Sequence, residues 1–382
     1  MQNQVRKTAP KSNSEVLFCL GMLLLIIFEV LLVTVVLLRS FESVEKPVQP
    51  PVSDMDEPPT GADTNQPQPS NPVFAAGTAV PLPQSDASTA TVSNAINSQY
   101  AVLVDAESGK ILAGKNADAR FAPASMTKVM TLIVACEMLS QDDLDREVMM
   151  TDEILRYVTS GAYYGTGRAA YEPGLKAGMK DLLYGIGVES FSDCTVMVVS
   201  ELCPTATVEE SERQFVARMN QKVKDMGLGN THFDNVTGHE GENNYSTASD
   251  MAAIMMYALK CPLIKDILST KTHDYYVQRL EDDGVTYARW TYHFYSTLFN
   301  ANPKSPSRIK AYETAYGKTF ALANATLGGG KTGSLGAGTS YTYSLVSYAE
   351  RDGNIYVMVT GETTQAHSVM YDAKILYDTY LK

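Results

Sequence analysis

The stretch FAPASMTKVMTL, Phe121–Leu132, decides the fold that we expect for this chain. Pro123 favours a turn, and Ser125 falls where a helix should begin. The apolar residues that follow lie on every side of this helix instead of on one stripe, which is typical of a helix buried in a core. Lys128 comes one turn after Ser125, so that both side chains project from the same face.

A serine and a lysine at this spacing indicate an activated nucleophile. A buried lysine whose pKa is lowered can accept the proton of a neighbouring hydroxyl, and the Ser125 N–H at the positive end of the helix would face a developing oxyanion. The alternative interpretation makes Ser125 a helix N-cap and Lys128 a surface lysine. The spacing alone does not decide, because Ser43 and Lys46 repeat it in a segment that we expect to be disordered.

The composition argues against several classes of function. The 382 residues carry a net charge of -12, which speaks against nucleic acid as a partner. The sequence has 5 cysteines and 5 histidines but neither a C-x-x-C pair nor an H-E-x-x-H motif, so we expect no metal site. A disulfide between Cys194 and Cys203 and free buried cysteines are both compatible with the sequence.

The segments before the folded domain differ sharply in composition. Residues 1–15 are polar and basic, which predicts a cytoplasmic tail. Residues 16–38 form one apolar run that at ~1.5 Å per residue spans a bilayer, so we expect a single-pass anchor in the cell membrane with the rest of the chain outside. A cleaved signal peptide is the alternative, although the run is long and no A-x-A-like site follows. Residues 39–95, rich in Pro and Ser, predict a disordered linker before a domain over 96–382.

The domain itself should have strands at its two ends and helices between them. Tyr100–Asp105 and Lys110–Ala113 predict a hairpin. From the Ser125 helix to about residue 325 we expect mainly helices and long loops, with a capping box at Thr207 and a mobile Tyr-rich loop over 157–174 that either lines a cleft or packs on the surface. Further strands at 341–350 and 355–361 and a helix over 367–381 close the domain. This order predicts an α+β fold: one antiparallel sheet flanked by helices, with an inserted helical subdomain.

Three short motifs occur in order along this domain. They are S-x-x-K at Ser125–Lys128, Ser190-Phe191-Ser192 and Lys331-Thr332-Gly333, within the flanks YAVLVDAESGKILAGKNADARFAPASMTKVMT, KDLLYGIGVESFSDC, NVTGHEGENNYSTASDMA and GGGKTGSLGAGTSYTYSLVSYAERDG. Over about residues 96–382 the chain resembles the D-alanyl-D-alanine carboxypeptidase family of low-molecular-mass penicillin-binding proteins. The resemblance implies the penicillin-binding protein/β-lactamase-like transpeptidase fold.

The resemblance also implies a mechanism that needs no metal or organic cofactor. Ser125 would attack the D-Ala-D-Ala peptide bond with Lys128 as base, and Ser190 would relay a proton to the leaving D-alanine. On an edge strand, Lys331 and Thr332 would hold the terminal carboxylate, and Gly333 would allow close approach. The N–H groups of Ser125 and Ser334 would form the oxyanion hole.

By this resemblance the protein is a bacterial, membrane-tethered serine D,D-carboxypeptidase that trims peptidoglycan stem peptides, binds β-lactams and serves cell-wall biosynthesis and cell shape. The sequence departs from the family pattern, and these departures leave alternatives open. Ser192 stands where the family has asparagine, which would suit a catalytically weakened protein that only binds peptidoglycan or β-lactams. A β-lactamase is a third alternative, although no deacylating glutamate motif is present. His367 is the nearest candidate for the basic residue that relatives carry after the last strand, and the N-terminal helix would replace their C-terminal anchor.

Overall fold

The computed structural model describes residues 69–381 apart from 93, 282–283, 285, 300–305 and 338–339. The predicted tail (1–15), the predicted anchor (16–38) and residues 39–68 of the predicted linker therefore lie outside the described residues. Within the part that the structure describes, none of the helices has the length and apolar character needed to cross a membrane.

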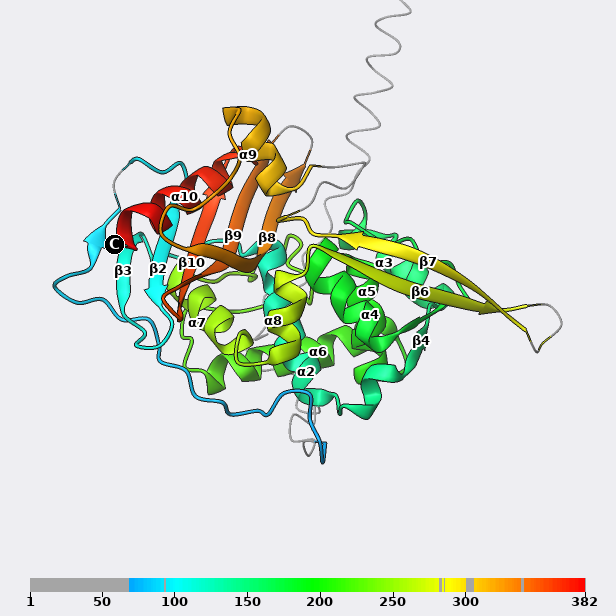
Figure 1. The fold of residues 1–382 in the computed structure, drawn as a ribbon. Helices are drawn as coiled ribbons and strands as arrows, with labels where there is room; N and C mark the ends of the chain where they lie inside the picture. Colours follow the sequence, from blue (N-terminus) through cyan, green and yellow to red (C-terminus); the bar gives the residue numbers. More distant parts are fainter. Residues whose placement is uncertain are drawn as a thin grey trace, which may run out of the picture. The chain divides into compact units, whose positions relative to one another are not determined.

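The main sheet is assembled from the two ends of the domain, as predicted (Figure 1). Its six strands lie in the order β1-β3-β2-β10-β9-β8, and all neighbours are antiparallel except β1 and β3. The strand bounds are β1 Ala90–Thr91, β2 Tyr100–Asp105, β3 Ile111–Lys115, β8 Thr326–Ala337, β9 Ser340–Arg351 and β10 Asn354–Thr363. Because β8 ends the order, one of the motif-bearing segments forms a sheet edge.

Helices cover both faces of this sheet (Figure 1). The closing helix α10, Ser368–Tyr380, lies on one face, and the helical region lies on the other. Strand β2 shows the alternation, since Ala101 and Leu103 belong to the core under α10 whereas Val102 and Val104 belong to the larger core on the opposite face. The predicted α+β fold is confirmed.

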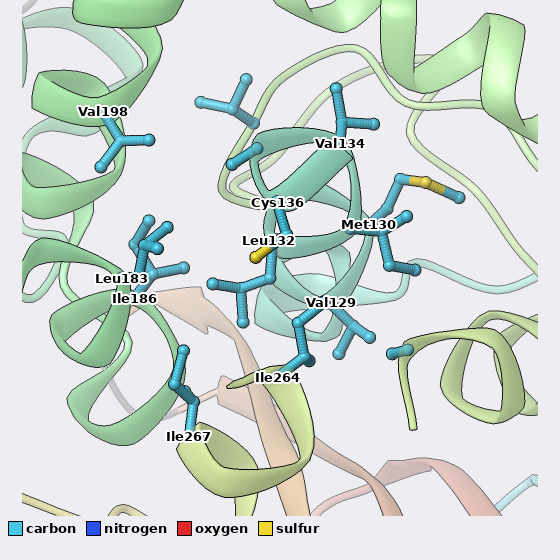
Figure 2. Packing of buried hydrophobic residues seen from close by; sticks show 14 of the residues in the cluster. Val129, Met130, Leu132, Val134, Cys136, Leu183, Ile186, Val198, Ile264 and Ile267 are labelled. Atoms are coloured by element: carbon cyan, nitrogen blue, oxygen red, sulfur yellow. The ribbon is translucent and has the colours of Figure 1, made fainter. Parts of the chain in front are cut away.

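The helical region is built around α2, Lys128–Met138. Its residues from Lys128 to Cys136 are all buried, which confirms the prediction of a helix enclosed on every side. Figure 2 shows Val129 and Leu132 of α2 surrounded by side chains from neighbouring helices, among them Leu183, Val198 and Ile264. The other helices here are α3 Asp152–Val158, α4 Met179–Tyr184, α5 Ser192–Leu202, α6 Val208–Asp225, α7 Ala248–Ala258 and α8 Pro262–Ser269.

The helix start predicted at Thr207 is confirmed, and Thr207 is the N-cap of α6. The Thr207 hydroxyl accepts a hydrogen bond from the Glu210 N–H at 3.2 Å. The chain leaves the helix at Gly227, whose φ of 71° suits a glycine.

The expectation of mainly helical structure up to residue 325 is wrong between residues 272 and 295. There β6, Thr272–Leu280, and β7, Tyr287–Tyr295, form a long hairpin that extends from the body of the domain (Figure 1). With β4, Glu147–Met149, and β5, Lys176–Gly178, they make a second sheet in the order β4-β5-β6-β7. Aromatic and β-branched residues dominate both long strands, a composition that favours strands over helices. Helix α9, Arg308–Tyr316, follows the hairpin.

One further expectation is corrected, and one open alternative is decided. The disordered linker does not reach residue 95, because Val73 and Phe74 are buried and their N–H groups donate to the carbonyls of Leu139 and Cys136 at 2.8 and 3.0 Å. These apolar side chains give the Pro-rich segment a place to pack against the end of α2. The Cys194–Cys203 disulfide is not formed, and both cysteines are free and buried.

Candidate active site

One cleft of about 670 Å³ collects residues from all three motifs. Six of the eight predicted site residues line it: Ser125, Lys128, Ser190, Ser192, Thr332 and Ser334. They come from the turn before α2 and the first residue of α2, the segment around the start of α5, and edge strand β8. The fold therefore brings together groups that are far apart in the sequence.

Ser125 lies in a 3-10 turn, Ala124–Thr127, that leads directly into α2. Its side chain does not cap the helix, since α2 begins only at Lys128 and no side chain caps either element. The N-cap interpretation is therefore wrong. Ala124, just before it, has a φ of 50°, a left-handed conformation that is costly for a residue other than glycine. Such strain beside a nucleophile indicates that the surrounding structure holds the serine in a defined position.

Lys128 is buried beside Ser125, so the surface-lysine alternative is wrong as well. Its Nζ lies 3.2 Å from the Ser125 Oγ and donates a hydrogen bond to the Thr237 carbonyl at 2.9 Å. Burial lowers the pKa of this amine to about 7. Near neutral pH a substantial fraction of the amine is therefore unprotonated and able to accept the serine proton.

Ser190 presents a hydroxyl that no other described group engages. The residue follows a turn of π-helix, Gly185–Glu189, and has a left-handed φ of 67°. Its Oγ is buried and has no hydrogen-bond partner among the described residues, although it belongs to the cleft lining. A buried hydroxyl without a partner is costly, and a ligand in the cleft would satisfy it.

Ser192 is the first residue of α5, and its N–H donates to the Gly167 carbonyl at 2.9 Å. The adjacent Asp193 turns away from the cleft and accepts hydrogen bonds from the N–H groups of Ala169 and Ala170 at 3.0 and 2.9 Å. The start of α5 therefore fastens the loop over 164–167, which lines the cleft.

On β8, Thr332 and Ser334 line the cleft, whereas Lys331 and Gly333 do not. A Cβ at Gly333 would lie 3.1 Å from the Pro123 carbonyl oxygen, so the strand approaches the nucleophile turn closely. Lys331 is fully buried, and its Nζ donates to the Thr332 carbonyl at 3.0 Å. Burial, followed by the charges of Lys128 and Arg308, lowers the pKa of Lys331 well below its usual range. The predicted direct contact of Lys331 with a substrate therefore lacks support from the free structure.

The cation on the cleft surface near β8 is Arg308, which sequence reasoning missed. Its Nη2 donates to the Ser334 Oγ at 2.5 Å, and its guanidinium lies 4.8 Å from the centre of the Tyr343 ring. His367, the candidate from sequence, packs against the Tyr316 ring and is not part of the cleft lining. No local motif marks Arg308, because its place in the cleft depends on how α9 folds back to β8.

A second element missed by the predictions is the loop over residues 235–240. Its Thr237 carbonyl holds Lys128, and Thr237, Gly238, His239 and Glu240 all line the cleft. Gly238 has a φ of 80°, and a Cβ there would lie 1.8 Å from the Ala124 carbonyl oxygen, so only glycine fits. Burial, with a smaller contribution from Lys128, lowers the pKa of His239 to about 4. The passage NVTGHEGENNYSTASDMA carried the signal that could have located this loop.

Part of the Tyr-rich segment over 157–174 lines the cleft, which is one of the two predicted alternatives. Ala162 and the stretch from Tyr164 to Gly167 line the cleft, whereas Tyr163 is buried. Helix α3 and a short 3-10 turn, Gly161–Tyr163, give the first half of the segment regular structure.

Comparison with known proteins assigns this arrangement to a family. The model of the peptidase S11 family, described as D-alanyl-D-alanine carboxypeptidase, matches residues 86–305. D-alanyl-D-alanine carboxypeptidase DacF of Bacillus subtilis (strain 168) is 36% identical over 182 residues, which cover 48% of this chain and 43% of that protein. DacA of Escherichia coli (strain K12) is 32% identical over 160 residues, 42% of this chain and 38% of DacA. The chain thus spans less than half the length of these curated relatives.

Solved structures agree with the sequence match. A variant of the Streptomyces K15 DD-transpeptidase superposes with a TM-score of 0.61 at 25% identity, covering 75% of this chain and 99% of that chain. A D-alanyl-D-alanine carboxypeptidase from Mycobacterium tuberculosis H37Rv shares the fold, with a TM-score of 0.54 at 20% identity over 81% of this chain and 94% of that one. Since the family model covers more than half of the chain, the protein belongs to the D-alanyl-D-alanine carboxypeptidase family of S11 peptidases.

Proposed function

We propose that this protein is a serine D,D-carboxypeptidase that removes the terminal D-Ala from peptidoglycan stem peptides through an acyl-enzyme. The observation that carries the proposal is the pairing of the Ser125 hydroxyl with a buried amine at 3.2 Å, in a cleft that also contains Ser190, Thr332 and Ser334. This is the arrangement of a nucleophile and its base beside further polar groups for a substrate.

In the proposed acylation step, the unprotonated Lys128 amine takes the proton of Ser125 as Oγ attacks the carbonyl carbon of the terminal peptide bond. The N–H groups of Ser125 and Ser334 stabilise the oxyanion. The C–N bond then breaks, and the Ser190 hydroxyl gives its proton to the leaving amine of D-alanine while it takes up the proton that Lys128 removed from Ser125, so that both groups return to their starting states. The Ser190 Oγ has no hydrogen-bond partner among the described residues, which supports this role because a bound substrate would supply that partner.

The substrate's terminal carboxylate needs a positive group, which a chain of net charge -12 has to provide locally. Arg308 suits this task, since a guanidinium stays ionised even though burial lowers the pKa of Arg308. Thr332 and Ser334 add hydroxyl donors on the same side of the cleft. Lys331 supports the strand from behind through its bond to the Thr332 carbonyl. Water finally hydrolyses the acyl-enzyme, and every step uses only the chain's own groups and water.

Release of D-alanine tests the proposal. The full-length protein is incubated with a peptide ending in D-Ala-D-Ala, and free D-alanine is measured for wild type and Ser125→Ala. Release by the wild type and none by the variant is the expected result. A folded wild type that releases no D-alanine would defeat the carboxypeptidase reading.

A second candidate is a catalytically weakened protein that binds peptidoglycan or β-lactams without efficient turnover. Ser192 favours it, because a serine cannot offer the two N–H donors of an amide at this point in the cleft. A stable penicillin adduct together with negligible D-alanine release would support this candidate. Rapid loss of the adduct would instead support β-lactamase activity.

We further propose that the domain acts outside the cell membrane, tethered by residues 16–38. The length of this apolar run, broken only by Glu29 and Thr34, and the basic residues before it support the proposal. Recovery of the protein in the membrane fraction, with the domain accessible to protease added outside, is expected. Recovery in the soluble fraction would contradict it.

A further inference from the structure

A buried carboxylate outside the groups used so far joins the two loops that line the cleft. Glu212, on α6, is only 6% exposed. Its Oε2 accepts a hydrogen bond from the Tyr157 hydroxyl at 2.6 Å. Its Oε1 accepts one from the Tyr163 hydroxyl at 2.6 Å and another from the Val236 N–H at 3.1 Å. Three donors from two separate segments therefore converge on one side chain.

Both segments continue directly into the cleft. Tyr163 is followed by the stretch from Tyr164 to Gly167, and Val236 is followed by Thr237, whose carbonyl accepts the hydrogen bond from Lys128 at 2.9 Å. The carbonyl of Val236 itself accepts from the Thr131 hydroxyl at 2.7 Å, which ties the same loop to α2. Two hydrogen bonds and the two consecutive residues Val236 and Thr237 therefore connect Glu212 to the amine of the proposed base.

The two loops also touch each other above this carboxylate. The Tyr163 ring meets the His239 ring edge-on at a centroid distance of 4.6 Å, and the His239 Nδ1 lies 2.9 Å from the Thr237 Oγ1. The position of Tyr163, fixed by Glu212, therefore bears on the side chain of Thr237 as well as on the backbone that leads to it.

A carboxylate such as that of Glu212 is unfavourable at a buried position on a helix. Its burial costs free energy that hydrogen bonds only offset, and an apolar residue of similar volume often gives equal or greater stability. Tyr163 and Val236 are themselves buried, but the segments that carry these donors continue into residues that line the cleft, so the effect of Glu212 falls on the geometry of the cleft.

We propose that Glu212 is a positioning residue of the active site, which sets the Thr237 carbonyl and hence Lys128 by fixing the loops over 157–167 and 235–240. This inference rests on the proposed acylation of Ser125. It predicts that loss of the Glu212 oxygens slows the chemical step while initial binding of a ligand in the cleft changes little.

Acylation by benzylpenicillin separates these effects. The full-length protein is titrated for its penicillin-competent fraction, and the dependence of the acylation rate on penicillin concentration gives the noncovalent dissociation constant and the acylation rate constant. Glu212→Met removes every acceptor but keeps the volume, and we expect its acylation rate constant to fall about 10- to 100-fold, as a misplaced catalytic group does. Glu212→Gln keeps one carbonyl oxygen for Tyr163 and Val236, so it should restore most of the rate.

Two further variants keep the test decisive if Glu212→Met folds poorly. Tyr163→Phe removes a single hydroxyl at the same carboxylate and should lower the acylation rate constant by a smaller factor. Asp372→Asn is the matched control, since Asp372 is a fully buried carboxylate that accepts bonds from Asn97 and Ser98 and lies outside the cleft lining. The thermal stability of Asp372→Asn should fall, while the acylation rate constant of its penicillin-competent fraction should equal that of the wild type.

The outcomes distinguish the two proposals. A wild type that is never acylated overturns the proposed function itself. A wild type that is acylated, with Glu212→Met and Tyr163→Phe reacting at the wild-type rate per competent molecule, overturns the role of Glu212 alone. Equal losses in Glu212→Met and Glu212→Gln would also contradict it, because the retained oxygen should matter.

Discussion

At one end of the cleft, Ser125 and Lys128 are three residues apart and meet within one helical turn, with Nζ and Oγ at 3.2 Å. At the other end, Arg308 reaches Ser334 across 26 residues, and Thr297 reaches Thr332 across 35 residues at 2.8 Å. At the nucleophile end, local helix geometry brings the two side chains together and the Thr237 carbonyl then holds Lys128. At the anion-binding end, every contact depends on distant segments, those that carry Thr297 and Arg308, meeting β8. The proximity of Ser125 and Lys128 therefore follows from their spacing in the sequence, whereas the contacts of Arg308 and Thr297 exist only in the folded domain.

The two ends also treat their cations differently. Burial lowers the pKa of Lys128 to about 7, which suits a group that has to lose a proton. Arg308 keeps its charge under burial because a guanidinium has no accessible neutral form. Lys128 can therefore act as the base while Arg308 stays charged to bind an anion in the same cleft. Variants of Lys128 and of Arg308 should affect acylation and substrate binding separately.

The largest effect is expected at the nucleophile end. Lys128→Met removes the proposed base and should lower the rate of penicillin acylation by about 1000-fold, within the range for loss of a general base. The matched control is Lys222→Met, since Lys222 is another buried lysine, paired with Glu137 at 2.7 Å outside the cleft lining. A similar loss of rate in both variants, per competent molecule, would show that burial and not base chemistry explains the effect.

The anion-binding end should respond to the charge on the substrate. Arg308→Ala should lower kcat/KM for a peptide with a free terminal carboxylate by about 30-fold, the equivalent of about 2 kcal/mol for a truncated charge pair. The same peptide with a terminal amide should be hydrolysed equally by wild type and variant. Arg308→Lys should fall between them, because it keeps the charge but loses the fork of donors. An equal loss on both peptides would argue against carboxylate binding.

The pH dependence of acylation sharpens the contrast between the two cations. Because Lys128 acts as a neutral amine with a pKa of about 7, protonation at lower pH removes the active form. The acylation rate should therefore rise with pH through 7 and fall about tenfold between pH 6 and pH 5. A rate that stays constant from pH 5 to pH 8 would contradict the assignment of Lys128 as the base.

The smallest effect is expected at Ser192, between the two ends. Ser192→Asn adds an amide that can donate to the substrate, and one hydrogen bond of ~1 kcal/mol corresponds to about a fivefold rise in turnover. Measurement of D-alanine release at saturating peptide checks this. An unchanged rate would remove the reason for regarding the protein as weakened at Ser192.

Prediction from sequence succeeded where local pattern dictates structure. The all-round apolar run after Ser125 gave the buried helix α2, and alternating strands at both ends gave the main sheet. It failed for the β6–β7 hairpin, whose aromatic residues lie on both faces, with Tyr276, Trp290 and Tyr292 exposed. That distribution hides the period of two by which a strand is recognised.

The candidate site divides in the same way. The S-x-x-K motif located the nucleophile end, because its spacing puts Ser125 and Lys128 together, and the third motif located Thr332 on the side of the cleft formed by β8. Arg308 and Thr297 carry no such spacing, and their place in the cleft follows only from tertiary packing. Lys331 shows the converse, since its motif was recognised but its burial behind Thr332 was not predictable from spacing.

The central claim is that the Ser125 hydroxyl becomes acylated in this cleft. The most direct test is the intact mass of the full-length protein after incubation with benzylpenicillin, for wild type and Ser125→Ala. We predict that the wild type gains the mass of one penicillin molecule and that the variant, folded to the same thermal stability, gains none. An adduct of equal amount on Ser125→Ala, or a folded wild type without an adduct at any penicillin concentration, would contradict the account.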